Sequence, residues 1–374
     1  MERTILFLMS DTGGGHRASA QAIEEAVHHL YPQRYTIIIE DMWKNHTPWP
    51  FNRMPDLYGW ITGPGLPLWR VLWSMSAYAY VQNILFILIF SFLVRSGANY
   101  LGMVRPDLIV SVHPMMNHLG MAWLRAAGLN VPFITIVTDM VTFHPSWICP
   151  EVTRCIVPTD QARDRALKFG MPPEKVVVCG QPVGLKFIAP NRDKSAIRQQ
   201  LGLLTDRYTI MVMGGGEGFG KIYKVARQIA QQAPQAQLII VAGRNRSLKH
   251  KLEAATWEIP THIYGFVDNM PDLMRASDVL VTKAGPGTIS EAFITGLPPV
   301  LLGYIPGQET GNVAYVQEHE AGVYARKPLD VAHLICDWMT PGNPTLQHMS
   351  QNAARLARPQ ASLQIANELC QLVG

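Results

Sequence analysis

The sequence predicts an α/β protein made of two successive domains, each with a parallel sheet covered on both faces. The chain has 374 residues, more than one domain usually contains. Short apolar runs of strand length alternate with segments of helical spacing, which is typical of parallel sheets. This alternation stops at residues 180–193, which contain Gly and Pro and lack periodicity, and then starts again. We therefore expect domains at 1–185 and 186–360, followed by a C-terminal helix at 361–374.

The elements of each domain follow from the apolar runs. In the first domain we expect a helix at 17–30 and strands at 4–9, 35–39, 108–112, 133–137, 154–157 and 176–178. In the second we expect a helix at 197–203 and strands at 208–213, 237–241, 262–264, 279–282 and 299–302. Most of these strands are followed by glycine or polar residues, so candidate binding residues gather where strands end.

The composition and net charge of the chain exclude some classes of function. Hydrophobic residues make up 48% of the chain and charged residues 16%, with a net charge of +4. This charge is too small to indicate nucleic-acid binding, and it is compatible with an anionic bilayer or an anionic small molecule. Five cysteines without metal-like or paired spacing indicate free thiols.

An aromatic and apolar segment at residues 48–94 interrupts the α/β pattern. Residues 71–94 contain no charged side chain over a length that would permit a membrane span. A span would separate strand 4–9 from its own sheet, so we expect an interfacial, monotopic element instead. A buried core helix is the alternative. The residues expected to meet lipid are Trp69, Trp73, Leu85, Phe86, Phe90 and Phe92.

The first candidate site follows the first strand. Residues 11–15 (DTGGG) allow a close approach of the backbone to a ligand, and Gly14, Gly15 and Arg17 are expected at the acceptor side. His16 stands where this loop enters the next helix. A histidine there is a candidate general base toward an acceptor hydroxyl group. A helix-capping or structural role is the equally weighted alternative.

Two further loops predict the donor side. Residues 213–220 (MGGGEGFG) follow a strand and resemble an anion cradle for a diphosphate. Residues 283–291 (KAGPGTISE) place Glu291 where its carboxylate can accept ribose hydroxyl groups. The alternative for Glu291 is a capping box with Thr288.

Polar residues at 304–312 (YIPGQETGN) suit the recognition of sugar hydroxyl groups. Weaker candidates follow other strands: Asp139, which supports His16 or binds the acceptor, His113 and His144. The chain has no DxD motif, so we expect a transferase without a metal ion or other cofactor, in which glycine loops and helix N-termini take the leaving-group charge.

The motifs GGGHRASA, MGGGEG, GFVDNMPDLM, KAGPGTISEA and YIPGQETGNVAYV together resemble the monogalactosyldiacylglycerol synthases and the processive diacylglycerol glucosyltransferases. They are also similar to the cell-wall transferase that adds N-acetylglucosamine to lipid I. The resemblance covers nearly the whole chain. It implies a GT-B architecture, in which two Rossmann-like domains face a central cleft and the N-terminal one carries the membrane-associating insert.

The resemblance also implies residue roles. His16 would be the base, Phe266 and Val267 would lie near uracil, and Glu291 would hold the ribose. Gln308 and Glu309 would hold the sugar. The complete set expected on the donor side is Gly214, Gly215, Gly216, Glu217, Gly218, Arg244, Phe266, Val267, Gly285, Gly287, Thr288, Glu291, Gln308, Glu309 and Asn312.

We therefore expect an inverting transfer of galactose from UDP-galactose to the 3-hydroxyl group of diacylglycerol. Alternatives are UDP-glucose as donor, a polyprenyl-linked acceptor, a UDP-sugar 2-epimerase and a noncatalytic sensor. The absence of a plastid-type targeting extension predicts a bacterial enzyme on the cytoplasmic face of the cell membrane, in contact with anionic lipid.

Overall fold

A computed structural model describes residues 3–12, 14–62, 65–76, 91–189, 192–218, 221–340 and 343–374. The chain divides into two compact units. The first contains Met1–Leu185 together with Pro306–Glu309 and Pro359–Gly374, and the second contains Lys186–Ile305 and Thr310–Arg358. The change of unit after Leu185 falls at the predicted boundary. The C-terminal helix and the short Pro306–Glu309 segment, however, belong to the first unit.

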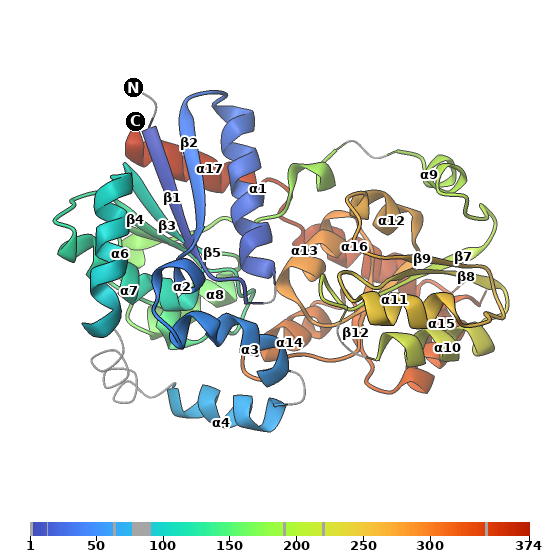
Figure 1. Cartoon of the computed structure of the whole chain (residues 1–374). Coiled ribbons are helices and arrows are strands. Elements are labelled where there is room, and N and C mark those ends of the chain that lie inside the picture. Colours follow the sequence, from blue (N-terminus) through green and yellow to red (C-terminus); the bar gives the residue numbers. More distant parts are fainter. Residues whose placement is uncertain are drawn as a thin grey trace. The chain divides into compact units, whose positions relative to one another are not determined.

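The first unit is built on a six-stranded parallel sheet with the order β2-β1-β3-β4-β5-β6 (Figure 1). Its strands are β1 (Arg3–Met9), β2 (Tyr35–Asp41), β3 (Leu108–Ser111), β4 (Phe133–Ile136), β5 (Arg154–Val157) and β6 (Val176–Val178). All six strands were predicted, because each contains a short apolar run. The inner strands β1, β3, β4 and β5 are largely buried, and β2 and β6 at the edges are partly exposed.

The side chains of β1 alternate between the two layers. Ile5 and Phe7 pack in a core that includes residues of α1 (Gly15–Leu30) and α17 (Ala361–Val373). Leu6 and Leu8 pack in the opposite core, which includes residues of α6 (Ser91–Val104), α7 (Pro114–Ala126) and α8 (Asp160–Lys168). Both faces of the sheet are therefore covered.

The second unit has a parallel sheet with the order β12-β11-β10-β7-β8-β9. Its strands are β7 (Tyr208–Met213), β8 (Ala236–Val241), β9 (Thr261–Tyr264), β10 (Val279–Thr282), β11 (Pro299–Leu301) and β12 (Val323–Tyr324). Its helices are α9 (Lys194–Gln200), α10 (Ile222–Gln232), α11 (Arg246–Glu253), α12 (Met270–Ala276), α13 (Pro286–Ile294), α14 (Thr310–Glu318), α15 (Pro328–Trp338) and α16 (Thr345–Leu356). Only β12 was not predicted, because two residues carry no periodicity.

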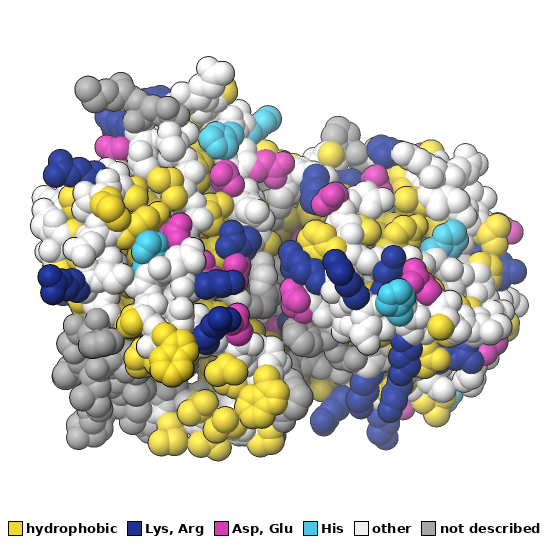
Figure 2. All heavy atoms as spheres, viewed as in Figure 1, with side chains coloured by type: hydrophobic (Ala, Val, Ile, Leu, Met, Phe, Trp, Pro, Cys, Tyr) yellow, Lys and Arg dark blue, Asp and Glu magenta, His cyan; other side chains and the backbone are white. Residues whose placement is uncertain are grey.

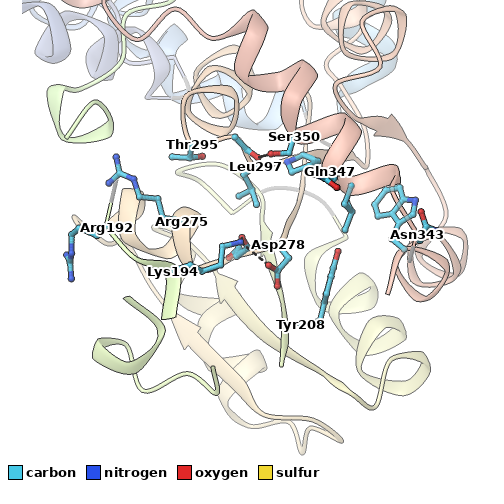
Figure 3. Close-up of a pocket in the computed structure, with 15 residues that line it drawn as sticks. Arg192, Lys194, Tyr208, Arg275, Asp278, Thr295, Leu297, Asn343, Gln347 and Ser350 are labelled. Carbon is cyan, nitrogen blue, oxygen red and sulfur yellow. Dashed lines mark hydrogen bonds and ion pairs between the residues drawn. The ribbon is translucent and has the colours of Figure 1, made fainter. Parts of the chain in front are cut away.

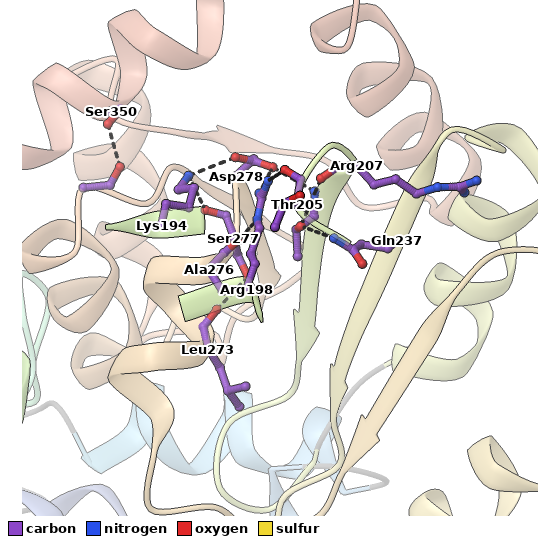
Figure 4. A network of polar contacts seen from close by, with 12 residues as sticks. Lys194, Arg198, Thr205, Arg207, Gln237, Leu273, Ala276, Ser277, Asp278 and Ser350 are labelled. Atoms are coloured by element: carbon purple, nitrogen blue, oxygen red, sulfur yellow. Dashed lines mark hydrogen bonds and ion pairs between the residues drawn. The ribbon is translucent and has the colours of Figure 1, made fainter. Parts of the chain in front are cut away.

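A polar network fixes α9 to the amino-terminal ends of the central strands of this second sheet (Figure 4). The Asp278 carboxylate, just before β10, accepts hydrogen bonds from Arg198 at 2.6 Å, from Lys194 at 2.9 Å and from the Thr209 backbone at 2.8 Å. Arg198 is buried, so its charge is compensated by Asp278. The first helix after the predicted linker is thus held to β7 and β10.

The short helix α2 (Met42–His46) precedes the aromatic insert, which forms the 3₁₀ helix Phe51–Arg53 and the short helices α3 (Met54–Ile61) and α4 (Leu66–Ser76) in the first unit. None of the helices in the described part of the chain is both long enough and apolar enough to cross a bilayer. Of the residues expected to meet lipid, Leu85, Phe86 and Phe90 lie outside the described residues. The same holds for the Phe92 side chain.

Candidate functional site

The predicted acceptor residues meet at the carboxyl ends of three neighbouring strands of the first sheet. In the register of β1, β3 and β4, Leu8 pairs with Ser111 and Ser111 with Thr135. The loops that follow these strands therefore lie together. They carry His16 at the start of α1, His113 at the start of α7, and Thr138 after β4.

Direct contacts join these side chains. The His16 and His113 rings meet edge-to-face, with 4.6 Å between their centroids. His16 Nδ1 lies 3.0 Å from the Thr138 hydroxyl oxygen, and His113 Nε2 lies 3.1 Å from that of Thr12. The two imidazoles are thus held by hydroxyl groups, which can donate or accept according to the tautomer.

Burial keeps both imidazoles neutral at physiological pH. It lowers the pKa of His16 to about 4, although a hydrogen bond to the Val112 backbone and the charge of Asp11 act in the opposite direction. Burial and the neighbouring His16 lower the pKa of His113 well below its ordinary value. A neutral His16 retains a lone pair that can accept a proton.

The helix-capping alternative for His16 is not supported. The N-cap of α1 is Gly14, whose φ of +76° places it in the left-handed region, and Gly15 is the first helical residue. Gly14 therefore caps the helix, and His16 is the second residue of the helix.

Asp139 belongs to a neighbouring set of contacts. Its carboxylate accepts hydrogen bonds from Trp147 Nε1 at 2.7 Å and from Gln308 Nε2 at 3.0 Å. The Trp147 ring in turn lies 6.1 Å from the His16 ring. Thr138, rather than Asp139, therefore provides the described hydrogen bond to His16, and Asp139 is joined to the His16 region through Trp147.

The other acceptor candidates have structural partners. Arg17 donates two hydrogen bonds to the Asp11 carboxylate, at 2.8 and 2.7 Å. His113 accepts from the Met115 backbone and caps α7. His144 caps the 3₁₀ turn Pro145–Trp147, and burial lowers its pKa to about 4.

Gln308 and Glu309 differ most from their expected position. They were predicted in the second domain, but the segment Pro306–Glu309 packs within the first unit. Gln308 contacts Asp139 through its amide nitrogen and accepts a hydrogen bond from the Tyr58 hydroxyl at 3.0 Å. Glu309 is buried. Tyr58, Trp147 and Thr12 were not predicted as site residues, because their contacts are distant in sequence.

In the second unit, the glycine loop after β7 packs against the loop after β8. A Cβ atom on Gly243 would lie 2.2 Å from the Gly216 carbonyl oxygen, and one on Gly218 would lie 2.3 Å from the Ala242 carbonyl oxygen. Both glycines also have φ near +60°. Close backbone packing thus requires glycine at these two positions, independently of any ligand.

Charged and aromatic side chains stand beside this loop. Arg244 donates to Glu217 at 3.0 Å, and its guanidinium lies 4.3 Å from the centroid of the Phe266 ring. Phe266 is exposed, and Val267 beside it is half-buried. An exposed aromatic face suits the stacking of a planar base. Of the predicted cradle at 213–220, residues 219 and 220 lie outside the described residues.

The start of α13 provides a second donor-side element. Its N-cap is Gly285 without a side-chain cap, so the capping box predicted as the alternative for Thr288 and Glu291 does not form. A Cβ atom on Gly287 would meet nothing within 4 Å. Burial raises the pKa of Glu291 to about 7, against the opposing charge of Lys186. Asn312 is buried and donates to the Ala284 carbonyl oxygen at 2.9 Å, which fixes this loop.

A cavity of about 540 Å³ lies elsewhere in the second unit (Figure 3). It is lined at the amino-terminal side of the sheet by residues such as Tyr208, Asp278 and Leu297, and none of the predicted site residues lines it. In the described part of the chain no group of three His, Cys, Asp or Glu side chains is arranged to hold a metal ion. The expectation of a metal-independent reaction stays a prediction.

Comparisons with known proteins agree with this architecture. Residues 16–183 match the monogalactosyldiacylglycerol (MGDG) synthase family, and residues 209–365 match the glycosyltransferase family 28 C-terminal domain. Among solved structures, Anabaena HepE in complex with UDP-glucose has a TM-score of 0.59 at 16% identity, covering 98% of this chain and 99% of that chain. Acinetobacter baumannii MurG has a TM-score of 0.61 at 14% identity, covering 99% of both. The predicted GT-B fold is confirmed.

Curated relatives are considerably more similar. The probable chloroplastic MGDG synthase of Glycine max is 42% identical over 99% of this chain and 72% of that protein. MGDG synthase 1 of Arabidopsis thaliana, also chloroplastic, is 40% identical over 99% of this chain and 71% of that protein.

The predicted location in a bacterial cell membrane is wrong. The relatives named above are chloroplastic plant proteins, as is the MGDG synthase of Spinacia oleracea at 41% identity. The expected resemblance itself is confirmed over the whole length of the chain. The chain belongs to the monogalactosyldiacylglycerol synthase family of glycosyltransferases.

Proposed function

We propose that the protein transfers galactose from UDP-galactose to the 3-hydroxyl group of 1,2-diacylglycerol, with inversion at the anomeric carbon. Membership of the MGDG synthase family supports both the sugar and the lipid acceptor. The observation that carries the chemistry is the neutral His16 ring, half-buried at the strand ends of the first unit and hydrogen-bonded to Thr138.

In the proposed reaction His16 accepts the proton of the 3-hydroxyl group as that oxygen attacks C1 of galactose. The new C–O bond forms while the bond between C1 and the UDP oxygen breaks, so UDP leaves with its electron pair. One displacement with one base and no covalent nucleophile inverts the anomeric centre. The Thr138 hydroxyl, 3.0 Å from His16 Nδ1, fixes the ring during the transfer.

The second unit is proposed to bind the donor. The backbone N–H groups at the start of α13, beside the open space at Gly287, suit a diphosphate. Glu291 would accept the ribose hydroxyl groups, and Phe266 would stack on uracil. No resident metal ion is proposed, so the reaction should proceed in the presence of a chelator such as EDTA.

Acceptor supply is proposed to depend on a lipid surface. Exposed apolar side chains gather on α3 and α4 of the first unit, visible as the yellow group along the lower edge of Figure 2. They include Trp60 at 56%, Val71 at 54% and Met75 at 54% exposure. Such a patch on a protein surface indicates a membrane or partner contact. Two exposed arginines suit anionic headgroups: Arg70 on α4 and Arg53 in the 3₁₀ helix before α3.

The test is UDP release by the purified protein with lipid vesicles, offering UDP-galactose and UDP-glucose separately, with and without diacylglycerol. We expect release that depends on diacylglycerol and is faster with UDP-galactose. Faster release with UDP-glucose would show that UDP-glucose, and not UDP-galactose, is the preferred donor. Release that is independent of diacylglycerol would reject the lipid acceptor.

A further inference from the structure

Helices α3 and α4 have two different faces. The outward face is apolar and exposed, with Leu57, Leu68, Val71, Leu72 and Met75 among its residues. The opposite face carries the aromatic side chains Tyr58, Trp69 and Trp73, which contact one another in series. Their ring centroids lie 6.0 Å apart between Tyr58 and Trp69 and 5.4 Å apart between Trp69 and Trp73.

This aromatic face holds the segment Pro306–Glu309. Trp69 Nε1 donates a hydrogen bond to the Pro306 carbonyl oxygen at 3.0 Å. Gly307, with a φ of +86°, lies so close to the Trp73 indole that an added Cβ atom would be 2.4 Å from Nε1. The backbone of this segment is therefore positioned by the same helices whose other face is apolar and exposed.

The Gln308 side chain is held at both of its polar ends. Its carbonyl oxygen accepts from the Tyr58 hydroxyl at 3.0 Å, and its amide nitrogen donates to Asp139 at 3.0 Å. Its backbone carbonyl oxygen accepts from the Thr142 hydroxyl at 3.0 Å. Burial and the carboxylates of Glu309 and Asp139 raise the pKa of Tyr58, so its hydroxyl remains a donor.

We propose that Tyr58 and Trp69 are positioning residues for Gln308, and that they make donor binding depend on seating of α3 and α4 in a lipid surface. The inference rests on the proposed function and on the role implied for Gln308 by the family resemblance, namely contact with the sugar of the donor. It assigns to the insert a role beyond anchoring, because its inner face sets the geometry of a sugar-recognising side chain.

The physical basis is thermodynamic linkage. In these two described helices, no side chain of α4 and only Pro55 of α3 is fully buried, and Tyr58, Trp69 and Trp73 are half-buried. Short helices in water owe their stability to packing rather than to intrinsic propensity. A lipid surface that buries the outward face stabilises both helices, and with them the contacts to Pro306 and Gln308. A ligand that favours those contacts must in turn favour the seated helices.

The experiment measures the equilibrium binding of UDP-galactose to the whole chain, with and without vesicles of phosphatidylcholine and phosphatidylglycerol that contain no diacylglycerol. For the unmodified protein we expect vesicles to tighten donor binding by about fivefold or more. Tyr58→Phe and Trp69→Phe each remove one hydrogen-bond donor and keep an aromatic ring. We expect each to weaken donor binding in the presence of vesicles by about 3- to 10-fold.

Tyr31→Phe is the matched control, because Tyr31 also donates one hydrogen bond, to Asn367 at 2.8 Å, on a different part of the first unit. It should bind the donor as the unmodified protein does. Sedimentation with vesicles and the thermal midpoint of unfolding should be the same for Tyr58→Phe and Tyr31→Phe. This result would separate positioning from folding and from anchoring.

Unchanged donor affinity in both Tyr58→Phe and Trp69→Phe would overturn the inference, as would an unmodified protein that sediments with vesicles without binding the donor more tightly. Diacylglycerol-dependent UDP release is measured on the same preparations. If UDP is released but vesicles do not tighten donor binding, only the inference is rejected. If vesicles tighten donor binding but no UDP is released, the proposed reaction is rejected and the positioning role of Tyr58 and Trp69 is retained.

Discussion

The two units have the same sheet architecture but differ in what stands at the carboxyl ends of their strands. In the first unit these ends carry side chains in contact with each other, such as His16 with Thr138 and Asp139 with Trp147. In the second unit they carry glycines whose backbones touch, such as Gly243 and Gly216. The first arrangement fixes the position and protonation of side chains, while the second provides backbone N–H groups and space. We propose that the first arrangement serves proton transfer and that the second serves binding of the UDP part of the donor.

The largest expected effect is on turnover, after substitution of a side chain at the strand ends of the first unit. Replacing His16 with Ala should lower turnover by about 10²- to 10⁴-fold, because a positioned general base contributes an acceleration of that order. UDP binding should be nearly unchanged, since the residues proposed to hold the uracil, ribose and diphosphate lie in the other unit. The measurement is UDP release together with calorimetry of UDP binding. His29→Ala, an exposed histidine on the same helix, is the control, and near-normal turnover of His16→Ala would reject the base.

The role of the glycines in the second unit is tested by two matched substitutions to alanine. Gly243→Ala should lower the free energy of unfolding of the second unit by about 2–4 kcal/mol, because the new methyl group meets the Gly216 carbonyl oxygen at a left-handed φ. Gly287→Ala meets no protein atom and lies in a helix, so it should leave stability unchanged or raise it by up to about 1 kcal/mol. Chemical denaturation checks both values. Weaker UDP binding is expected in Gly287→Ala, and unchanged affinity would show that the ligand does not approach this residue.

Glu291 provides a smaller effect with a pH signature. Its pKa of about 7 means that the carboxyl group is neutral below pH 7 and ionised above it. Since an ionised carboxylate is the better acceptor for ribose hydroxyl groups, UDP affinity should rise as the pH increases through about 7. Glu291→Gln should lower the affinity at pH 8 by about 10-fold and abolish this pH dependence. A pH dependence that persists in the variant would assign it to another group.

The smallest expected effect concerns the buried histidines of the first unit. The pKa of His144 is about 4 in the folded protein, against 6.5 for a solvated histidine, so the unfolded chain binds more protons between these values. Stability from this group is therefore complete above pH 6.5 and is lost as the pH falls toward 4, by up to about 1.4 kcal/mol per pH unit. His144→Asn should reduce that slope in urea denaturation series, whereas the exposed His29→Asn should not. Equal slopes in the two variants would contradict this assignment.

All strands except β12 could be predicted because each contains a short apolar run, and this property is local in sequence. The same locality placed His16, Glu291 and the glycine loops at strand ends. The partners of these residues could not be predicted in the same way. Thr138 contacts His16 across more than one hundred residues, and Gln308 contacts Tyr58 across 250. Only the folded register of the chain brings them together.

The segment Pro306–Glu309 shows the same limit at the level of domains. Its Pro and Gly residues correctly predicted a loop after a buried strand. Its packing, however, depends on Trp69 and Trp73, which lie in a helix predicted only for its contact with lipid. The sequence predicted that Trp69 and Trp73 meet lipid, whereas the structure places both against a segment that is more than two hundred residues away in the chain.

The position of α17 has a consequence for biosynthesis. This helix packs in the core of the first unit, where Asn367 accepts a hydrogen bond from Tyr31 and Ser362 donates to the Val183 carbonyl oxygen at 2.7 Å (Figure 1). On the ribosome, residues 186–358 emerge before this helix does, so the second unit has all of its own residues available while the first still lacks one wall of its core. The unit that is translated first is thus the last to be completed. Until then the apolar residues of β1 and β3 in the same core, such as Ile5 and Leu108, lack the cover of this helix, and chaperones would have to shield them.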